Sequence, residues 1–346
     1  MDKEKGPATH NQKMPIYNKD SDLLVIRDLH THFFTPDGVL RALDGVDLRL
    51  PKGKTLGLVG ESGCGKTVLA LSILRLIPDP PGRIVKGEIL FEGIDLLSLD
   101  ERAIRDVRGN KISMIFQEPM TSLNPVFTIG SQIAEVVLLH QHKRAATKKQ
   151  ALDVAMDMLK IVGIASPESR INDYPHQLSG GMCQRVMIAM ALACRPALMI
   201  ADEPTTALDV TTQAQILNLM KGLREEIDTS ILLVTHDLGV VAQSCHEVAV
   251  MYTGNIVESA SVEDIFSSPL HPYTRGLLRA IPRIGGLRSG ESLQAIAGNV
   301  PTLRDIPKGC TFNNRCPEVM DICRGEYPPV FRPKADHMVR CWRSAN

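Results

Sequence analysis

The segment GESGCGKT, residues 60–67, constrains the fold of this chain more than any other stretch. It follows a short apolar run, TLGLV, and precedes an apolar helical pattern, VLALSILRLI. A strand, a glycine-rich turn and a helix in this order match the pattern G-x-x-x-x-G-K-S/T, whose glycines let backbone N–H groups turn toward phosphate oxygens. The segment therefore predicts an α/β fold that holds phosphate groups between a strand and a helix.

The residues of this loop have distinct expected roles around the phosphates of a nucleotide. Lys66 adds a mobile positive charge, and Thr67 offers a hydroxyl to a magnesium ion. Cys64 is expected to be a small filler, because its backbone is what faces the phosphate. The nucleotide-binding residues predicted from this stretch are Gly60, Glu61, Ser62, Gly63, Cys64, Gly65, Lys66, Thr67 and Val68.

Two acidic residues end a second buried-strand pattern, ALMIADEP. In a parallel sheet, such a strand carries its carboxylates to the edge where the carboxyl ends of the strands meet. Asp202 is expected to hold Mg²⁺, and Glu203 is expected to polarise the attacking water. Alone, the pattern also fits a strand with a solvated acidic turn. The phosphate loop favours the catalytic interpretation, since phosphoryl transfer needs both parts.

Two more strand patterns end in neutral polar residues. SILLVTHD ends in His236, and KISMIFQEP ends in Gln117. From a strand end, each side chain is placed to approach a γ-phosphate or its water. The predicted catalytic residues are therefore Glu203, His236, Lys66 and Gln117, and Gln117 is also a candidate ligand of Mg²⁺.

The stretch LSGGMCQR precedes a helical run, VMIAMALAC, that Arg195 and Pro196 end. Ser179 is a natural N-cap for such a helix, which is the structural explanation. A cap does not account for the two glycines that follow it. A helix N-terminus carries about half a positive charge and free N–H donors, so glycines there also allow an anion to approach closely.

Composition excludes several classes of protein. Lys plus Arg and Asp plus Glu number 39 each, so no basic excess indicates a nucleic-acid partner. The polar N-terminus lacks the apolar region of a secretory signal, which indicates a disordered tail over residues 1–20 and a cytosolic chain. No run approaches the roughly 18 apolar residues of a membrane span, so any membrane association is expected to be peripheral.

Taken in order, these motifs resemble the nucleotide-binding subunit of ABC transporters, over about residues 22–258. The resemblance implies a RecA-like P-loop core with an antiparallel β edge, and a helical subdomain at about residues 120–178. It also implies that ATP and Mg²⁺ are bound, and that LSGGMCQR meets the γ-phosphate held by a different subunit. The residues implied in that contact are Ser179, Gly180, Gly181 and Gln184.

The same resemblance gives roles to two other positions. Asp209, in TTALDV, corresponds to a residue at the seam between two such subunits. Phe33 corresponds to the aromatic residue that stacks on adenine, although its neighbour Phe34 leaves the assignment open, and a core role is open for either ring. The groove of the helical subdomain is where the family receives a cytoplasmic helix of the membrane subunits.

Longer segments resemble the ATPases of oligopeptide, dipeptide and nickel importers, among them ADEPTTALDVTTQAQIL, HPYTRGLLRAIPR and GNVPTLRDIPKGCTFNNRCP. This implies an ATP-driven motor for peptide import, at the cytoplasmic face of the inner membrane. It implies a second homologous ATPase subunit, giving a heterodimer with a homodimer as the alternative. It further implies two membrane permease subunits and an extracytoplasmic substrate-binding protein. Nickel as cargo, a non-transport ABC ATPase and a metal-sensing module remain alternatives.

Four of the 8 cysteines lie in the last 37 residues, which belong to a loop-rich extension expected over residues 259–346, after an ATPase domain at 21–258. Their spacing, C-x5-C-x6-C-x17-C, lacks the short C-x2-4-C step usual for structural zinc. Members of the resembled group with these cysteines carry a 4Fe-4S iron-sulfur cluster, which favours a cluster over Zn²⁺ or free thiols. The predicted ligands are Cys310, Cys316, Cys323 and Cys341.

Overall fold

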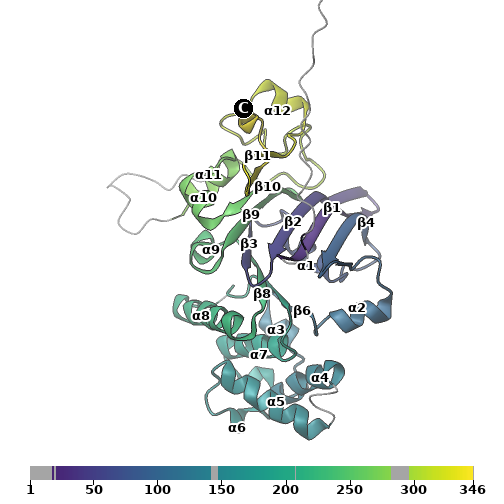
Figure 1. The fold of residues 1–346 in the computed structure, drawn as a ribbon, viewed down its shortest axis with the longest axis vertical. Coiled ribbons are helices and arrows are strands. Elements are labelled where there is room, and N and C mark those ends of the chain that lie inside the picture. Colours follow the sequence, from purple (N-terminus) through teal and green to yellow (C-terminus); the bar gives the residue numbers. More distant parts are fainter. Residues whose placement is uncertain (1–17, 19–20, 142–146, 207, 282–295, 346) are drawn as a thin grey trace, which may run out of the picture.

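The computed structural model describes residues 18, 21–141, 147–206, 208–281 and 296–345. The tail expected over residues 1–20 therefore lies outside the described residues, apart from Asn18. Over the described part of the chain, no helix has both the length and the apolar character needed to cross a membrane. In Figure 1, the helices of the middle of the chain lie at one end of the molecule, the C-terminal segment lies at the other, and two sheets lie between them.

The larger sheet has the strand order β11-β12-β10-β9-β3-β8-β7-β6. Five neighbouring strands of it run parallel: β9 (Glu247–Tyr252), β3 (Thr55–Val59), β8 (Ser230–Thr235), β7 (Leu198–Asp202) and β6 (Ile112–Ile115). β3, β7 and β8 are buried along their whole length. Parallel strands covered on both faces give continuous apolar runs, which explains why the sequence predicts four of these five.

Helices cover both faces of this sheet. They include α1 (Lys66–Ile73), α7 (Gly180–Leu192), α8 (Val210–Ile227) and α9 (Leu238–Ser244). Alternate residues of a strand point to opposite faces. On β7, Met199 and Ala201 pack into a cluster with α7 and α8, whereas Leu198 and Ile200 pack into a cluster with α1. The sheet thus has two separate apolar layers.

The smaller sheet is antiparallel and has the order β2-β1-β4-β5. Its strands are β1 (Asp22–Thr35), β2 (Gly38–Pro51), β4 (Gly82–Phe91) and β5 (Ile94–Asp95), and the chain continues into α2 (Glu101–Val107). Its inner face shares the apolar cluster of α1. The expected antiparallel β edge of the core is therefore confirmed.

A helical region follows β6 and lies at the far end of the molecule in Figure 1. It consists of α3 (Pro119–Ser122), α4 (Ile129–His140), α5 (Lys148–Ile161), α6 (Pro167–Arg170) and η1 (Pro175–Gln177). Thr128 caps α4 by accepting from the backbone N–H of Ser131, and Thr147 forms a capping box with Gln150 on α5. These helices occupy the span expected for the helical subdomain.

The C-terminal part of the chain extends the large sheet. Its elements are β10 (Asn255–Ser261), α10 (Val262–Ser267), α11 (Pro272–Arg279), α12 (Asp321–Gly325), β11 (Phe331–Lys334), β12 (His337–Val339) and η2 (Trp342–Ser344). β12 pairs with β10 at Glu258 and Ser259. The boundary expected at residues 258 and 259 falls inside β10, so the extension shares a sheet with the ATPase domain.

Glu258 anchors this extension, although it is fully buried. Its carboxylate accepts from the backbone N–H groups of Leu270 at 2.7 Å and His271 at 3.0 Å, and it lies 2.7 Å from Nε2 of His337. Burial raises the pKa of Glu258, but these hydrogen bonds outweigh it and hold the pKa below its ordinary value. A buried ionised carboxylate thus joins β10, β12 and the start of α11.

Candidate active site

The phosphate loop connects β3 to α1, and two of its glycines are required by their surroundings. Gly65 is the N-cap of α1 with a φ of 107°. A Cβ there would lie 2.8 Å from the carbonyl oxygen of Ala42, and a Cβ on Gly60 would lie 2.3 Å from that of Met251. Both positions therefore exclude any side chain.

The remaining side chains of the loop divide into inward and outward groups. Cys64 is fully buried, and burial raises the pKa of its thiol, so it fills space as a neutral group, in line with the filler role expected for it. Val68 packs against the apolar cluster of α1. Ser62, Gly63 and Thr67 are exposed, so the outer rim of the loop is open.

Lys66 is held by the carbonyls of its own loop. Its Nζ donates to the carbonyl oxygens of Gly60 at 2.9 Å and Glu61 at 3.2 Å, and only 6% of the residue is exposed. Each of these contacts exchanges readily for a phosphate oxygen, because the amine is on a flexible stem. The lysine is thus stored at the phosphate site.

Asp202 and Thr67 meet at the end of β7 and the start of α1. Burial raises the pKa of Asp202 above its ordinary value, although a hydrogen bond from Thr67 opposes the shift. Oδ1 of Asp202 is buried and has no hydrogen-bond partner among the described residues. A buried carboxylate oxygen with an open coordination position beside a hydroxyl fits a Mg²⁺ site, because Mg²⁺ prefers oxygen ligands.

Glu203 is the centre of a hydrogen-bonded group at the same edge of the sheet. Nε2 of Gln117 donates to its Oε2 at 3.2 Å, Oγ1 of Thr206 donates to the same oxygen at 2.9 Å, and Nδ1 of His236 lies 3.2 Å from Oε1. Burial raises the pKa of Glu203, but the bonds from His236 and Thr206 outweigh it, so the pKa lies below its ordinary value. The carboxylate is therefore ionised at neutral pH.

The strand ends thus bring together four predicted residues, Asp202, Glu203, Gln117 and His236. Glu203 itself has a φ of 48°, in the left-handed region, which a glutamate adopts only where its surroundings impose it. Thr206 was not predicted. Its position three residues after Glu203, in ADEPTT, is the only sequence signal for it.

The motif LSGGMCQR forms the start of α7. The helix begins at Gly180, one turn or more before the apolar run that marks it in the sequence, and Oγ of Ser179 caps it by accepting from the N–H of Met182 at 3.4 Å. Ser179 and Gly180 are exposed. Ser179 therefore caps α7 while the N-terminus of that helix remains exposed to solvent.

Two residues near this helix start have packing roles. A Cβ on Gly181 would lie 2.8 Å from Cγ2 of Thr212, in the first turn of α8. Asp209 caps α8, with its carboxylate accepting from the N–H of Thr212 at 3.0 Å and from its hydroxyl at 2.7 Å. Asp209 and the glycines of the motif are thus joined through Thr212.

Gln184 and Phe33 are the two remaining predicted nucleotide contacts. Gln184 is only 2% exposed on the inner face of α7, so the structure places its side chain in the core and not at the open helix start. Phe33 is half-buried, and its ring lies over Gly82, whereas Phe34 is 49% exposed. Phe33 as the adenine-stacking ring stays a prediction.

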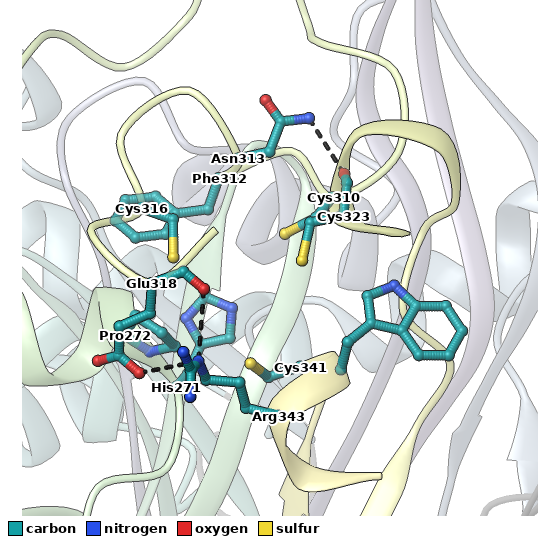
Figure 2. A pocket seen from close by; sticks show the side chains of 11 residues that line it. His271, Pro272, Cys310, Phe312, Asn313, Cys316, Glu318, Cys323, Cys341 and Arg343 are labelled. Atoms are coloured by element: carbon teal, nitrogen blue, oxygen red, sulfur yellow. Dashed lines mark hydrogen bonds and ion pairs between the residues drawn. The ribbon is translucent and has the colours of Figure 1, made fainter. Parts of the chain in front are cut away.

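The four tail cysteines face one cavity, shown in Figure 2. Cys323 and Cys341 are buried, whereas Cys310 and Cys316 are half-buried. Burial raises the pKa of Cys310 to about 11, and the neighbouring sulfurs add to the shift. Because this pKa is raised, a thiolate at Cys310 needs a nearby cation, such as a bound metal ion, to stabilise its charge.

The spacing of these sulfurs limits what the cavity suits. Among the residues that the structure describes, the one set of three candidate ligands with atoms within 4.8 Å of one another is His30, His32 and Asp44. No three tail sulfurs are that close. A tetrahedral zinc with Zn–S bonds of about 2.3 Å needs sulfurs about 3.8 Å apart. The cysteine site is therefore wider than a single zinc requires.

In the set on the antiparallel sheet, His30 already has carboxylate partners. Nδ1 of His30 lies 3.0 Å from a carboxylate oxygen of Asp44, and its Nε2 lies 2.8 Å from one of Asp28. Both ring nitrogens of His30 thus already have carboxylate partners within the chain.

Comparison with known proteins follows the same division of the chain. The model of the ABC transporter family matches residues 43–206. A solved ATP-binding cassette, a dimer in a post-hydrolysis state with ADP and phosphate, is 27% identical with a TM-score of 0.62, covering 69% of this chain and 98% of that one. The fold is that of an ABC transporter ATPase.

The C-terminal part identifies the branch. The model of the oligopeptide/dipeptide transporter C-terminal region matches residues 257–323. The probable peptide ABC transporter ATP-binding protein y4tR of Sinorhizobium fredii is 54% identical over 94% of this chain and 97% of that protein. The oligopeptide transport ATP-binding protein AppD of Bacillus subtilis is 52% identical, over 93% and 97%. The chain belongs to the ATP-binding subunits of oligopeptide/dipeptide ABC transporters.

Proposed function

We propose that this chain is the ATP-hydrolysing motor of an importer that moves di- or oligopeptides across the cytoplasmic membrane. The family and the names of the relatives, which specify peptide, oligopeptide and dipeptide transport, support this cargo. The observation that carries the hydrolytic step is the ionised Glu203, held by Gln117 and His236 beside the Asp202 and Thr67 pair.

The residues of the site divide the work of hydrolysis. The backbone N–H groups of the phosphate loop and Lys66 bind the phosphates, while Thr67 and Asp202 would hold Mg²⁺. Bound Mg²⁺ would neutralise part of the phosphate charge. Glu203 accepts a hydrogen bond from the attacking water and orients it, and His236 donates toward the terminal phosphate or its water.

Glu203→Gln tests this assignment in the assembled transporter. The amide keeps the shape of the side chain but is a poor acceptor for a proton, so phosphate release should fall by about 10²- to 10⁴-fold while ATP binding persists. Both quantities are measured on the same preparation, as phosphate release and as bound radiolabelled ATP. Turnover at the wild-type rate would remove Glu203 as the base.

The open start of α7 supports a site completed by a second subunit. Ser179 and Gly180 are exposed, and Val210, next to Asp209, is 83% exposed. An exposed apolar side chain is typical of a protein interface. The exposed N-terminus of α7 can bind a phosphate. Together they fit an interface with another ATPase subunit. We assign that subunit as a homologous, distinct chain, forming a heterodimer whose two half-sites enclose each ATP.

A second surface suits the membrane subunits. Phe116, Val126 and Phe127 are 41%, 71% and 53% exposed, and they flank the segment that begins at Gln117 and leads into the helical subdomain. These apolar side chains, beside the helical subdomain, are proposed to help receive a cytoplasmic helix of the membrane subunits. The chain would then sit at the cytoplasmic face of the inner membrane as a peripheral subunit, supplied by an extracytoplasmic substrate-binding protein.

The tail cysteines are proposed to bind a 4Fe-4S cluster, with Zn²⁺ as the alternative. Their convergence on one cavity and their wide spacing support a group larger than a single ion. The residues that would hold it are Cys310, Cys316, Cys323 and Cys341. A bound cluster would cross-link a segment with few regular elements and so stabilise its fold.

A further inference from the structure

The C-terminal extension holds Glu61, the second residue of the phosphate loop. Arg315 pairs with it through two parallel contacts, Nη1 to Oε2 at 2.7 Å and Nη2 to Oε1 at 3.0 Å. The backbone N–H of Glu61 donates to the hydroxyl of Tyr273 at 2.9 Å. These partners lie 254 and 212 positions away in the sequence. The position of Glu61 is therefore set from outside the ATPase motifs.

Arg315 is itself immobilised. Its side chain is 3% exposed, and its Nε donates to the carbonyl oxygen of Ala297 at 3.0 Å. Its guanidinium carbon lies 5.9 Å from the ring centroids of both Tyr252 and Phe312. A buried arginine that lost its carboxylate would be left with an uncompensated charge, so the pair with Glu61 resists opening.

The pair also controls charge at the phosphate site. The carbonyl of Glu61 accepts from Lys66, so the residue adjoins the amine that must meet the phosphates. An unpaired carboxylate at this point would repel a triphosphate and attract Lys66. The two-pronged contact with Arg315 neutralises this carboxylate.

Both contacts begin beside the cysteine cavity. Arg315 directly precedes Cys316, and its N–H donates to the carbonyl of Phe312 at 3.0 Å, closing a tight turn. Tyr273 donates its N–H to Nδ1 of His271 at 3.1 Å, and His271 lines the same cavity in Figure 2. The rings of Tyr273 and Phe312 lie 5.4 Å apart. The packed rings of Tyr273 and Phe312 thus connect the cysteine cavity to the phosphate loop.

We propose that Arg315 and Tyr273 are positioning residues for the phosphate loop. Through them, the conformation of the loop around Cys316 affects the affinity of the phosphate loop for ATP. This rests on the proposed binding of ATP at the loop. A disturbance at Cys316 displaces Arg315 and leaves Glu61 unpaired, which weakens ATP binding. Because coupling between two sites is reciprocal, bound ATP in turn stabilises the cysteine site.

The test measures the dissociation constant of MgATPγS for the full-length chain, purified without oxygen. Arg315→Met should weaken binding about tenfold. Adding Glu61→Gln to that variant removes the unpaired charge and should bring the constant back to within about threefold of wild type. Rescue by a second substitution separates positioning from simple damage to the fold.

Arg340→Met is the matched control. Arg340 also precedes a cavity cysteine and also joins the extension to the ATPase domain, through Asp47 at 3.3 Å, but it does not contact the phosphate loop. Its affinity for MgATPγS should equal that of wild type. Equal weakening in Arg340→Met, wild-type affinity in Arg315→Met, or no rescue by Glu61→Gln would each overturn the proposal. A wild-type chain that binds no MgATPγS would instead overturn the proposed function.

The reverse direction is read at Cys316 with N-ethylmaleimide on the chain freed of metal. Saturating MgATPγS should slow its labelling about fivefold in wild type and leave the rate unchanged in Arg315→Met. Peptide mass spectrometry assigns the label to Cys316. Equal protection in both chains would show that the arginine does not carry the coupling.

Discussion

The nucleotide site and the cysteine site of this chain are held in place by different means. Asp202, Glu203 and His236 follow directly from β7 and β8, which are buried along their length, so the core fixes the chemistry. Cys310 and Cys316 lie outside helices and strands, beside a small aromatic cluster. Side chains at the ends of buried strands are held in position by the core, whereas side chains on loops have less support from regular structure.

Asp202→Asn gives the largest effect expected among the variants that test this comparison, because the core already holds Asp202 in position. The amide loses the charge that would hold Mg²⁺, so kcat should fall by about 10²- to 10³-fold. Phosphate release by the assembled transporter, followed over a series of Mg²⁺ concentrations, should recover in part at high Mg²⁺.

Asp228→Asn is the matched control for this substitution. Asp228 is exposed at the C-terminus of α8 with a φ of 52°, a conformation that asparagine also adopts. Its kcat should equal that of wild type. If Asp202→Asn were equally active, Asp202 would be no ligand and the comparison of the two sites would fail at its better-defined half.

Cys316→Ser tests the other half. If a bound group holds the loops together, its loss should lower the unfolding free energy of the extension by about 3 kcal/mol, in the range of a lost cross-link. Iron and sulfide content, measured on anaerobic protein, should fall to background. Thermal unfolding of the same protein measures the loss of stability. Cys245→Ser, which changes a half-buried cysteine outside the tail, should keep both the iron and the stability. Stability that is indifferent to Cys316 would mean that packing alone holds the loops.

The sequence predicts the strands that carry Gln117, Asp202, Glu203 and His236, for the same physical reason. β3, β6, β7 and β8 appear as apolar runs because both faces are buried, and their polar last residues must meet at one edge. The burial of Gln184 is harder to predict from the sequence. The motif LSGGMCQR places this residue in α7 but does not indicate which face of the helix it lies on. Its burial follows from packing against other helices.

The cysteine region shows what the sequence does not contain. β12 has three residues, too few for a periodic pattern, and it forms by pairing with β10. The contact of Arg315 with Glu61 joins residues 254 positions apart, and no local pattern marks it. Cysteine spacing predicts that the thiols converge, but the distances between their sulfurs are set by long-range packing of the loops.

Glu258→Gln probes the seam between the two regions. The amide cannot accept all three hydrogen bonds that reach this buried carboxylate, so the variant should lose about 2 kcal/mol of stability at pH 7. The pKa of Glu258 lies below its ordinary value of 4.5. Its ionised form therefore stabilises the fold above about pH 4.5, and this contribution is lost as the pH falls through the folded pKa.

Denaturant unfolding from pH 7 to pH 3 measures this effect. The difference between wild type and Glu258→Gln should be constant near neutrality and should vanish in acid. Glu263→Gln, at an exposed position in the first turn of α10, should track wild type throughout. If the difference in unfolding free energy between wild type and Glu258→Gln persisted in acid, the shape of the side chain and not its charge would hold the extension on the sheet.

Gly180→Ala gives the smallest expected effect and tests whether the nucleotide site is complete within one chain. A Cβ at Gly180 meets no atom closer than Cδ2 of Leu208 at 4.0 Å, so alanine fits the single chain and should leave its melting temperature unchanged or slightly higher. If the phosphate of a companion's ATP approaches this helix start, the methyl group obstructs it. ATPase activity of the assembled transporter should then fall about tenfold.

Gly181→Ala supplies the contrast, because its Cβ would lie 2.8 Å from Cγ2 of Thr212. That variant should lower both stability and activity, as expected for a clash inside the chain. Lost activity with intact stability in Gly180→Ala has no explanation within one chain, since nothing there occupies the space that the methyl group takes. Full activity in Gly180→Ala would mean that no phosphate comes near α7, and that the half-site at β7 and β8 works without it.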